Sequence, residues 1–254
     1  ALEEQLLNCN PLLEALGNAK TLKNDNSSRF GKFIKITFND KGKISGGSIN
    51  SYLLEKSRVI TRGEGERSFH IFYQLLLPDS LSQNLQNTLH LMKPEEFKYL
   101  RGSECYSVES IDDKEEFEAT VLAMNTRGFS GEDQESVFRV VAACLHLGNL
   151  EFEGDETSRI SNPDVCDIVA DILEIDPQQL NSAIVKPKIL AGRDLVEKAL
   201  NPANAAFSRD ALVKALYGRL FLWIVQKIND TLKVKPRHKF IGILDIAGFE
   251  LFKN

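Results

Sequence analysis

The apolar run Phe-Ile-Gly-Ile-Leu at residues 240–244 constrains the fold of this chain more than any other segment. It ends in Asp245, and an uninterrupted run of this kind is typical of a strand buried on both faces of a mostly parallel sheet. Such a strand needs neighbours for its backbone hydrogen bonds, and the sequence offers only two other clear sheet-forming runs, at 31–38 and 48–54. We therefore expect this chain to be a segment of a larger protein.

Helical periodicity dominates the sequence between these strands. Apolar residues recur at three- and four-residue spacing from Ser130 to Gly148, which predicts an amphipathic helix with a capped start. Asn162, followed by a proline, is predicted to start a second one. A third candidate runs from about 208 to 232, and its stretch at 220–225 is apolar all round, which predicts a central, buried helix.

A shorter segment at residues 184–198 differs from these helices. Two extended runs flank Ala191-Gly192-Arg193 there, which indicates a surface hairpin and a candidate contact loop.

Composition excludes several classes of protein. With 254 residues, 43% of them hydrophobic, the chain can bury a substantial core, and a net charge of −5 gives no sign of a nucleic-acid binder. The four cysteines are far apart, which indicates neither a disulfide framework nor a zinc site and is simplest to explain in a reducing cytosol. Cys144, Cys166, His70 and His146 fall within helical patterns, so we expect them to be packed. The sequence contains neither a signal-peptide pattern nor an apolar run long enough to span a membrane.

Two polar loops carry the candidate chemistry. The first, from Asn24 to Phe33, offers amide, hydroxyl and guanidinium groups, although by itself it could be a turn whose side chains satisfy its own backbone. The second, from Asp245 to Glu250, places an acid after a predicted buried strand, where nucleotide-hydrolysing folds hold an aspartate near Mg²⁺. The alternative for this loop is a plain strand end.

Taken together, the two loops resemble switch I and switch II of the myosin motor domain. Residues 24–32 match the pattern Asn-x-Asn-Ser-Ser-Arg-Phe-Gly-Lys, and residues 245–250 match Asp-Ile-x-Gly-Phe-Glu. Segments 65–75, 143–149 and 210–214 also resemble myosin in family order, so the resemblance covers essentially the whole chain. Kinesins join similar loops over a much shorter interval and with a histidine pair after the arginine, so they fit less well.

The resemblance implies a mainly α fold with some β structure, equivalent to the segment from just before switch I to switch II and mostly to the upper 50 kDa subdomain. Its terminal strands would belong to a central, mostly parallel sheet of the P-loop-NTPase type. The expected divisions are an initial helix within 1–23, switch I at 24–33, strands at 34–60, a helical lobe at 61–239 with its hairpin at about 184–200, and a strand with switch II at 240–254.

The resemblance also implies roles for residues that would meet ATP and Mg²⁺. Ser28 would ligate the metal through its hydroxyl, and Asp245 would act on it through water. Asn24 would contact the phosphates, and Ser27 would help to hold the γ-phosphate and the attacking water.

Three further residues would close the site. The backbone N–H of Gly248 would meet the γ-phosphate, a position where a side chain would obstruct close approach. Arg29 and Glu250 would pair across the two loops. Opposite charges about 4 Å apart attract by roughly 4 kcal/mol at an effective dielectric constant near 20, before desolvation is subtracted. Such a pair can hold the loops together while γ-phosphate is present and part when it leaves.

The function implied for the intact protein is actin-activated, Mg²⁺-dependent ATP hydrolysis coupled to force, in the cytoplasm on the actin cytoskeleton. Asp194 is implied as an actin contact, although a lone acid on a hairpin is usually only solvated. The phosphate-loop pattern GxxxxGK[ST] is absent from the sequence, so we expect it upstream of Ala1 and expect the isolated segment to be inactive. Light chains or cargo would bind only through other regions. The alternative is a non-catalytic actin-binding or scaffolding module derived from a myosin head.

Overall fold

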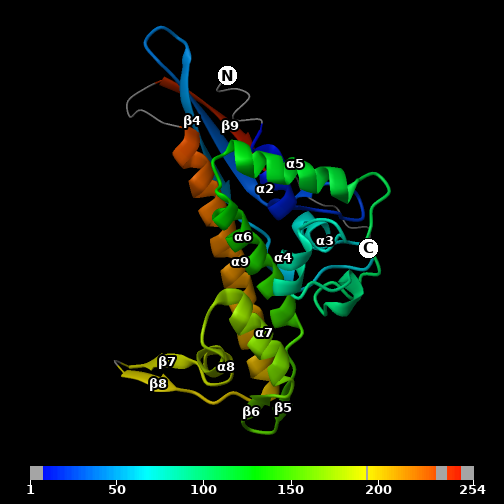
Figure 1. The fold of residues 1–254 in the computed structure, drawn as a ribbon. Helices are drawn as coiled ribbons and strands as arrows, with labels where there is room; N and C mark the ends of the chain where they lie inside the picture. The colour runs from blue at the N-terminus through cyan, green and yellow to red at the C-terminus, as the bar shows by residue number, and fades with distance from the viewer. Residues whose placement is uncertain (1–7, 193, 233–238, 247–254) are drawn as a thin grey trace.

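A computed structural model describes residues 8–192, 194–232 and 239–246. One long helix, α9 (Pro202–Leu232), forms the axis of the molecule. At 1.5 Å per residue, its 31 residues extend about 46 Å. A three-stranded sheet lies beside one end of α9 and a two-stranded hairpin lies near the other (Figure 1). The fold is mainly helical with some β structure, as the sequence predicts, and its sheets are small and antiparallel.

The three-stranded sheet has the order β4–β3–β9. Its central strand, β3 (Gly31–Phe38), pairs antiparallel with β4 (Ile44–Tyr52) and with β9 (Lys239–Asp245). The strands β3 and β4, which cover the two sheet-forming runs predicted at 31–38 and 48–54, form a hairpin. The mostly parallel sheet expected from the apolar run is not seen among these strands. An apolar run carries no information on strand direction, so the pattern alone could not distinguish parallel from antiparallel pairing.

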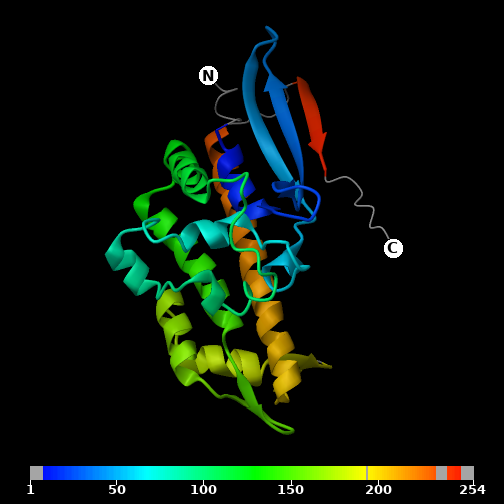
Figure 2. The same cartoon turned by 90° about the vertical axis from the view of Figure 1, so that its right-hand side faces the viewer.

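The described residues of this chain do not bury β9 on both faces. Its apolar side chains are exposed, and Phe240, Ile241, Ile243 and Leu244 each keep between 47% and 60% of their accessible surface. Figure 2 shows β9 at the edge of the sheet, with β3 on one side of it. The hydrogen bonds with β3 therefore define this strand, because the described residues put little over its faces.

Helices pack around the central part of α9. The amphipathic pattern is confirmed for α6 (Gly131–Gly148), whose start is capped by Ser130 and Asp133 in the predicted capping box. It is also confirmed for α7 (Pro163–Leu173), which follows Asn162. The remaining elements are α2 (Asn10–Gly17), β1 (Asn18–Ala19), β2 (Ser27–Ser28), η1 (Lys56–Val59), α3 (His70–Leu75), α4 (Gln83–Thr88), η2 (Pro94–Glu96), α5 (Asp113–Thr126), β5 (Phe152–Gly154), β6 (Ser158–Ile160), α8 (Pro177–Val185), β7 (Lys188–Ala191) and β8 (Asp194–Glu197).

Helix α9 is central, but it is not buried all round. It starts at Pro202, earlier than the expected 208, and it buries Tyr217 and Phe221 against its neighbours. Leu222 and Trp223, within the run that is apolar all round, remain 57% and 41% exposed. Six consecutive residues cover more than one helical turn, so part of the run must face away from the packed side. The prediction of complete burial was therefore wrong on this face.

Burial of the other single residues agrees with the sequence. Cys144, Cys166, His70 and His146 are all packed in the interior. Over the described residues, no helix is long and apolar enough to cross a membrane.

Candidate functional site

The first loop is folded by its own polar side chains. The Asn24 carboxamide oxygen accepts the backbone N–H of Asn26 at 2.9 Å, and the Thr21 hydroxyl donates to the carbonyl of Asn24 at 3.2 Å. Ser27 and Ser28 then form β2, which pairs with β1. The Asn24 side chain therefore satisfies a backbone N–H of its own loop, as in the polar turn that was the alternative interpretation of this segment.

Asn26 attaches the loop to the helices beside it. Its Oδ1 accepts from Asn18 Nδ2 at 3.0 Å and lies 3.1 Å from His70 Nε2, while its Nδ2 donates to Glu14 Oε2 at 3.0 Å. Burial, and next the charge of Arg67, lower the pKa of His70 to about 3, so its ring is neutral near pH 7. A neutral ring with a proton on Nε2 donates to Asn26 without bringing a charge to the loop.

An aromatic contact fixes the end of the loop that leads into β3. Phe30 is 4% exposed, and its ring meets Phe221 of α9 edge-on with centroids 4.9 Å apart. A Cβ atom at Gly17 would lie 2.4 Å from the Phe30 ring, so only glycine leaves room for it there. The Tyr217 hydroxyl donates to the carbonyl of Leu16 at 2.8 Å, which ties α9 to the same corner. The loop therefore rests on the long helix.

Arg29 lies between the loop and the helical lobe. Its Nε donates to Glu55 Oε2 at 2.6 Å, and one terminal nitrogen donates to the Ser27 hydroxyl at 3.1 Å. Its backbone N–H donates to the carbonyl of Gly17 and its carbonyl accepts from Glu55, so both ends of the residue are fixed. The expected pair with Glu250 lies outside the described residues.

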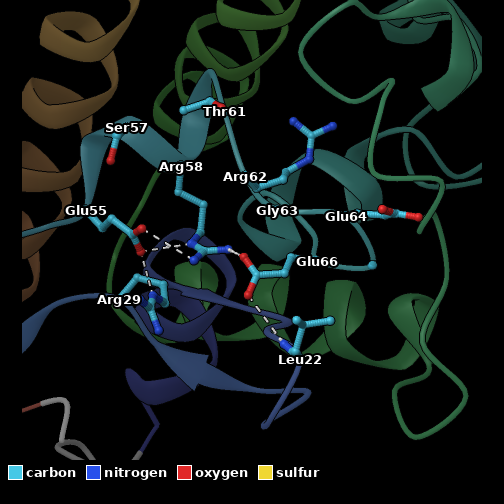
Figure 3. Close-up of a pocket in the computed structure, with 11 residues that line it drawn as sticks. Leu22, Arg29, Glu55, Ser57, Arg58, Thr61, Arg62, Gly63, Glu64 and Glu66 are labelled. Carbon is cyan, nitrogen blue, oxygen red and sulfur yellow. Dashed lines mark hydrogen bonds and ion pairs between the residues drawn. The ribbon is translucent and has the colours of Figure 1, made fainter. Parts of the chain in front are cut away.

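A cavity of about 1010 Å³ opens beside Arg29. Figure 3 shows its lining residues and a chain of contacts along one wall, from Arg29 through Glu55 and Arg58 to Glu66. Burial raises the pKa of the Glu55 carboxyl, but hydrogen bonds from Arg58 and Arg29 outweigh it and hold the pKa below its usual value. Glu55 is therefore ionised at neutral pH.

The second loop meets the first through the sheet. Lys32 of β3 is in register with Asp245 of β9, and Lys32 Nζ lies 3.3 Å from the Asp245 carboxylate. A Cβ atom at Gly31 would lie 3.0 Å from the Ile246 side chain, so the two chain segments touch there. The structure thus brings together the last residues of one predicted loop and the first residues of the other, although about 200 positions separate them in the sequence.

The described residues suit a magnesium ion that takes most of its ligands from phosphate and water. The Ser28 hydroxyl has no hydrogen-bond partner within the described part of the chain. No group of three or more histidine, cysteine or carboxylate side chains is placed to hold a metal there. Mg²⁺ keeps several waters and needs only one or two protein ligands when a nucleotide supplies the rest, so a hydroxyl such as that of Ser28 and a carboxylate such as that of Asp245 are donors of the kind it takes. Gly248 lies outside the described residues.

The predicted surface hairpin is present at the other end of α9. Asp194 starts β8 and pairs with Ala191 of β7 across the turn, and all four residues of β8 are exposed. The outward-facing side chains include Leu190 and Leu195, each 70% exposed. Asp194 is thus accessible, and β8 lies near the end of α9 opposite the three-stranded sheet (Figure 1).

Comparison with known proteins decides the family. The sequence model for the myosin head (motor domain) matches residues 1–254. The chain belongs to the myosin head family. It is 47% identical to the non-muscle myosin-2 heavy chain of Acanthamoeba castellanii, 46% identical to myosin-1 of Pyricularia oryzae and 46% identical to the myosin IE heavy chain of Dictyostelium discoideum, each across 100% of this chain. It spans only 17%, 21% and 26% of the length of these relatives.

Sequence reasoning missed several residues around the loops of this myosin head segment. Glu55, Asn26 and Lys32 each contact a residue with a predicted role or fix the loop that carries one. The spacing of Glu55 and Arg58 was the only signal available, because residues three apart can pair on one helical turn. The contacts from Glu55 to Arg29 and from Lys32 to Asp245 depend on the fold and leave no pattern in the sequence.

Proposed function

We propose that this chain is the segment of a myosin motor that supplies both switch loops and part of the actin-binding surface. The observation that supports the proposal is the meeting of the two loops at Lys32, Gly31, Asp245 and Ile246. The intact motor would hydrolyse ATP with Mg²⁺, would be activated by actin and would convert hydrolysis to force along the filament in the cytoplasm.

In this proposal the polar groups of the two loops have separate tasks. Ser28 would hold Mg²⁺ through its hydroxyl, and Asp245 would orient a water on the metal. A magnesium ion held by these residues would supply positive charge against the phosphates. Asn24 would contact the phosphates, and Ser27 would hold the attacking water near the γ-phosphate.

Closing the site would depend on the second loop. The backbone N–H of Gly248 would donate to the γ-phosphate, and Glu250 would pair with Arg29 across the gap. This pair would exclude water during hydrolysis and part after phosphate leaves, which couples the chemistry to movement of the loop.

A charge exchange in the intact motor tests this assignment. Arg29→Glu places two acids opposite each other and should abolish ATP hydrolysis, and adding Glu250→Arg should restore part of it. Steady-state phosphate release measures both variants, with Glu153→Arg added to Arg29→Glu as the control for a distant exchange. Absence of recovery in the Arg29→Glu, Glu250→Arg double variant would count against the pair.

The isolated chain should not hydrolyse ATP, because the phosphate-loop pattern is absent from its sequence. The lysine and amides of that loop supply most of the binding to the triphosphate. In the intact head we propose that β9 joins a larger, mostly parallel sheet of the P-loop-NTPase type and that the helical part forms the upper lobe. ATP turnover by the purified 254-residue chain at millimolar ATP would refute the proposal that hydrolysis needs a phosphate loop from outside this chain.

The second candidate is a non-catalytic myosin-derived module that binds actin or acts as a scaffold. The intact residue types at both loops, including Ser28, Arg29 and Asp245, favour the motor. Binding of a fluorescent ATP analogue to the full-length protein separates the candidates, since only the motor should bind nucleotide.

A further inference from the structure

Four side chains of alternating charge form a row that leads away from the first loop (Figure 3). The row consists of Arg29, Glu55, Arg58 and Glu66, and each neighbouring pair is in hydrogen-bonding contact. Glu66 also accepts the backbone N–H of Leu22 at 3.4 Å, so the row ends on the segment that precedes the loop. We call these four residues the charge row.

One oxygen atom holds the row together. Glu55 Oε2 accepts from Arg29 Nε at 2.6 Å and from Arg58 Nε at 2.9 Å. A carboxylate oxygen accepts from two guanidinium groups more strongly than a neutral amide oxygen does, because both hydrogen bonds are charge-assisted. Both side chains of the Arg29–Glu55 pair are partly buried, at 14% and 34% exposure, so solvent screens the contact less than it screens a surface pair.

Arg58 fixes the position of Glu55. Its Nε and one terminal nitrogen bind the two oxygens of Glu55, and the other terminal nitrogen donates to Glu66 at 3.0 Å and to the carbonyl of Arg67 at 3.2 Å. Only the planar fork of arginine reaches these partners at once. Arg67 is fully buried and binds Asp113 of α5 through two nitrogens at 2.9 Å. The row is therefore anchored in the helical lobe.

We propose that Glu55 is a positioning residue for the reaction of the motor and that Arg58 holds Glu55 in place. The inference rests on the proposed function, in which Arg29 closes the site. Glu55 holds Nε of Arg29 and so sets the plane of the Arg29 guanidinium group, including its two terminal nitrogens. Without the carboxylate, Arg29 would keep Ser27 as a partner and lose the anion that separates it from Arg58.

The test compares Glu55→Gln with the unchanged protein in the intact motor. The variant keeps the side chain's size and removes its charge. Because the variant weakens a hydrogen bond between two charged groups, kcat for ATP hydrolysis should fall on the order of 10-fold. The affinity for ADP, the KM for ATP and the melting temperature should change little, because Glu55 contacts Arg29 and the lobe and is not assigned to the nucleotide.

Glu153→Gln is the matched control. Glu153 also pairs with an arginine, at 2.8 Å, but the Arg159–Glu153 pair lies on the surface with side chains 80% and 50% exposed. Removing its charge should leave kcat unchanged. Glu55→Asp keeps the charge on a shorter side chain, so its kcat should fall between those of the unchanged protein and Glu55→Gln.

Three outcomes decide the inference. A kcat in Glu55→Gln equal to that of the unchanged motor would overturn the inference and leave the proposed function standing. A fall in kcat accompanied by losses of ADP affinity and of melting temperature would also overturn the inference, because it would show that the Arg29–Glu55 pair is purely structural. If the unchanged motor neither bound nor hydrolysed ATP, the proposed function would fail first and the inference with it. If Glu55→Gln did not fold, Arg58→Lys would take its place, with an expected severalfold fall in kcat at constant KM.

Discussion

The loop at residues 24–33 and the hairpin of β7 and β8 both present polar side chains, but they are supported very differently. The loop is held by Asn26, by Phe30 against α9 and by Glu55 on Arg29. The hairpin has exposed side chains along all of β8, and its base joins the body through backbone contacts such as the Leu200 N–H to the carbonyl of Val185, at the end of α8. A site for chemistry needs fixed geometry, whereas a surface that docks on a partner can adjust, so the difference in support is what the tasks proposed for the two regions require.

The largest expected effect is loss of the aromatic support under the loop. Phe221 is 1% exposed and meets the ring of Phe30, so Phe221→Ala should lower the free energy of unfolding by about 3–5 kcal/mol. Urea unfolding of the chain measures this change. Leu195→Ala, which truncates an exposed side chain of the hairpin, should stay within about 0.5 kcal/mol. Equal losses in the two variants would erase the contrast between the regions.

A smaller loss should follow from filling the space beside the same ring. In Gly17→Ala the new Cβ atom would lie within 2.4 Å of the buried Phe30 ring. Overpacking of this kind costs about 1–3 kcal/mol, because ring and helix must both shift. Gly131→Ala at the start of α6 is the control, because a Cβ atom there meets nothing within 4 Å.

Sequence patterns predicted the elements that local rules control. The capping box of Ser130 and Asp133, the helix after Asn162 and the hairpin around Gly192 all depend on residues within a few positions of one another. The patterns failed where distant segments meet. The direction of β9, the exposure of Trp223 and the contact of Glu55 with Arg29 depend on which elements the fold places side by side. The two loop motifs located the candidate site in the sequence. The contacts that support those loops were visible only in the structure.

Acid should weaken the loop region through the buried His70, which contacts Asn26. The pKa of His70 is about 3 in the folded chain, against 6.5 without perturbation, so below pH 6.5 the unfolded chain takes up a proton that the folded chain refuses. Stability is complete above pH 6.5 and falls by up to about 1.4 kcal/mol per pH unit as pH drops towards 3. His70→Gln does not titrate, so urea unfolding at pH 4–6 should show a flatter pH dependence. An unchanged slope would show that His70 is not held neutral.

The smallest structural effect is expected at the hairpin, where the proposed role concerns actin alone. Asp194 is exposed, so Asp194→Ala should change the free energy of unfolding by no more than about 0.5 kcal/mol. Actin-activated ATP turnover of the intact motor should nevertheless fall severalfold, and turnover without actin should stay constant. Glu197→Ala, at the other end of the same exposed strand, is the matched control and should retain more of the activation. If Asp194→Ala kept full activation by actin, Asp194 would be only a solvated side chain. The hairpin would then differ from the loop in how it is packed, with no actin-binding role assigned to this acid.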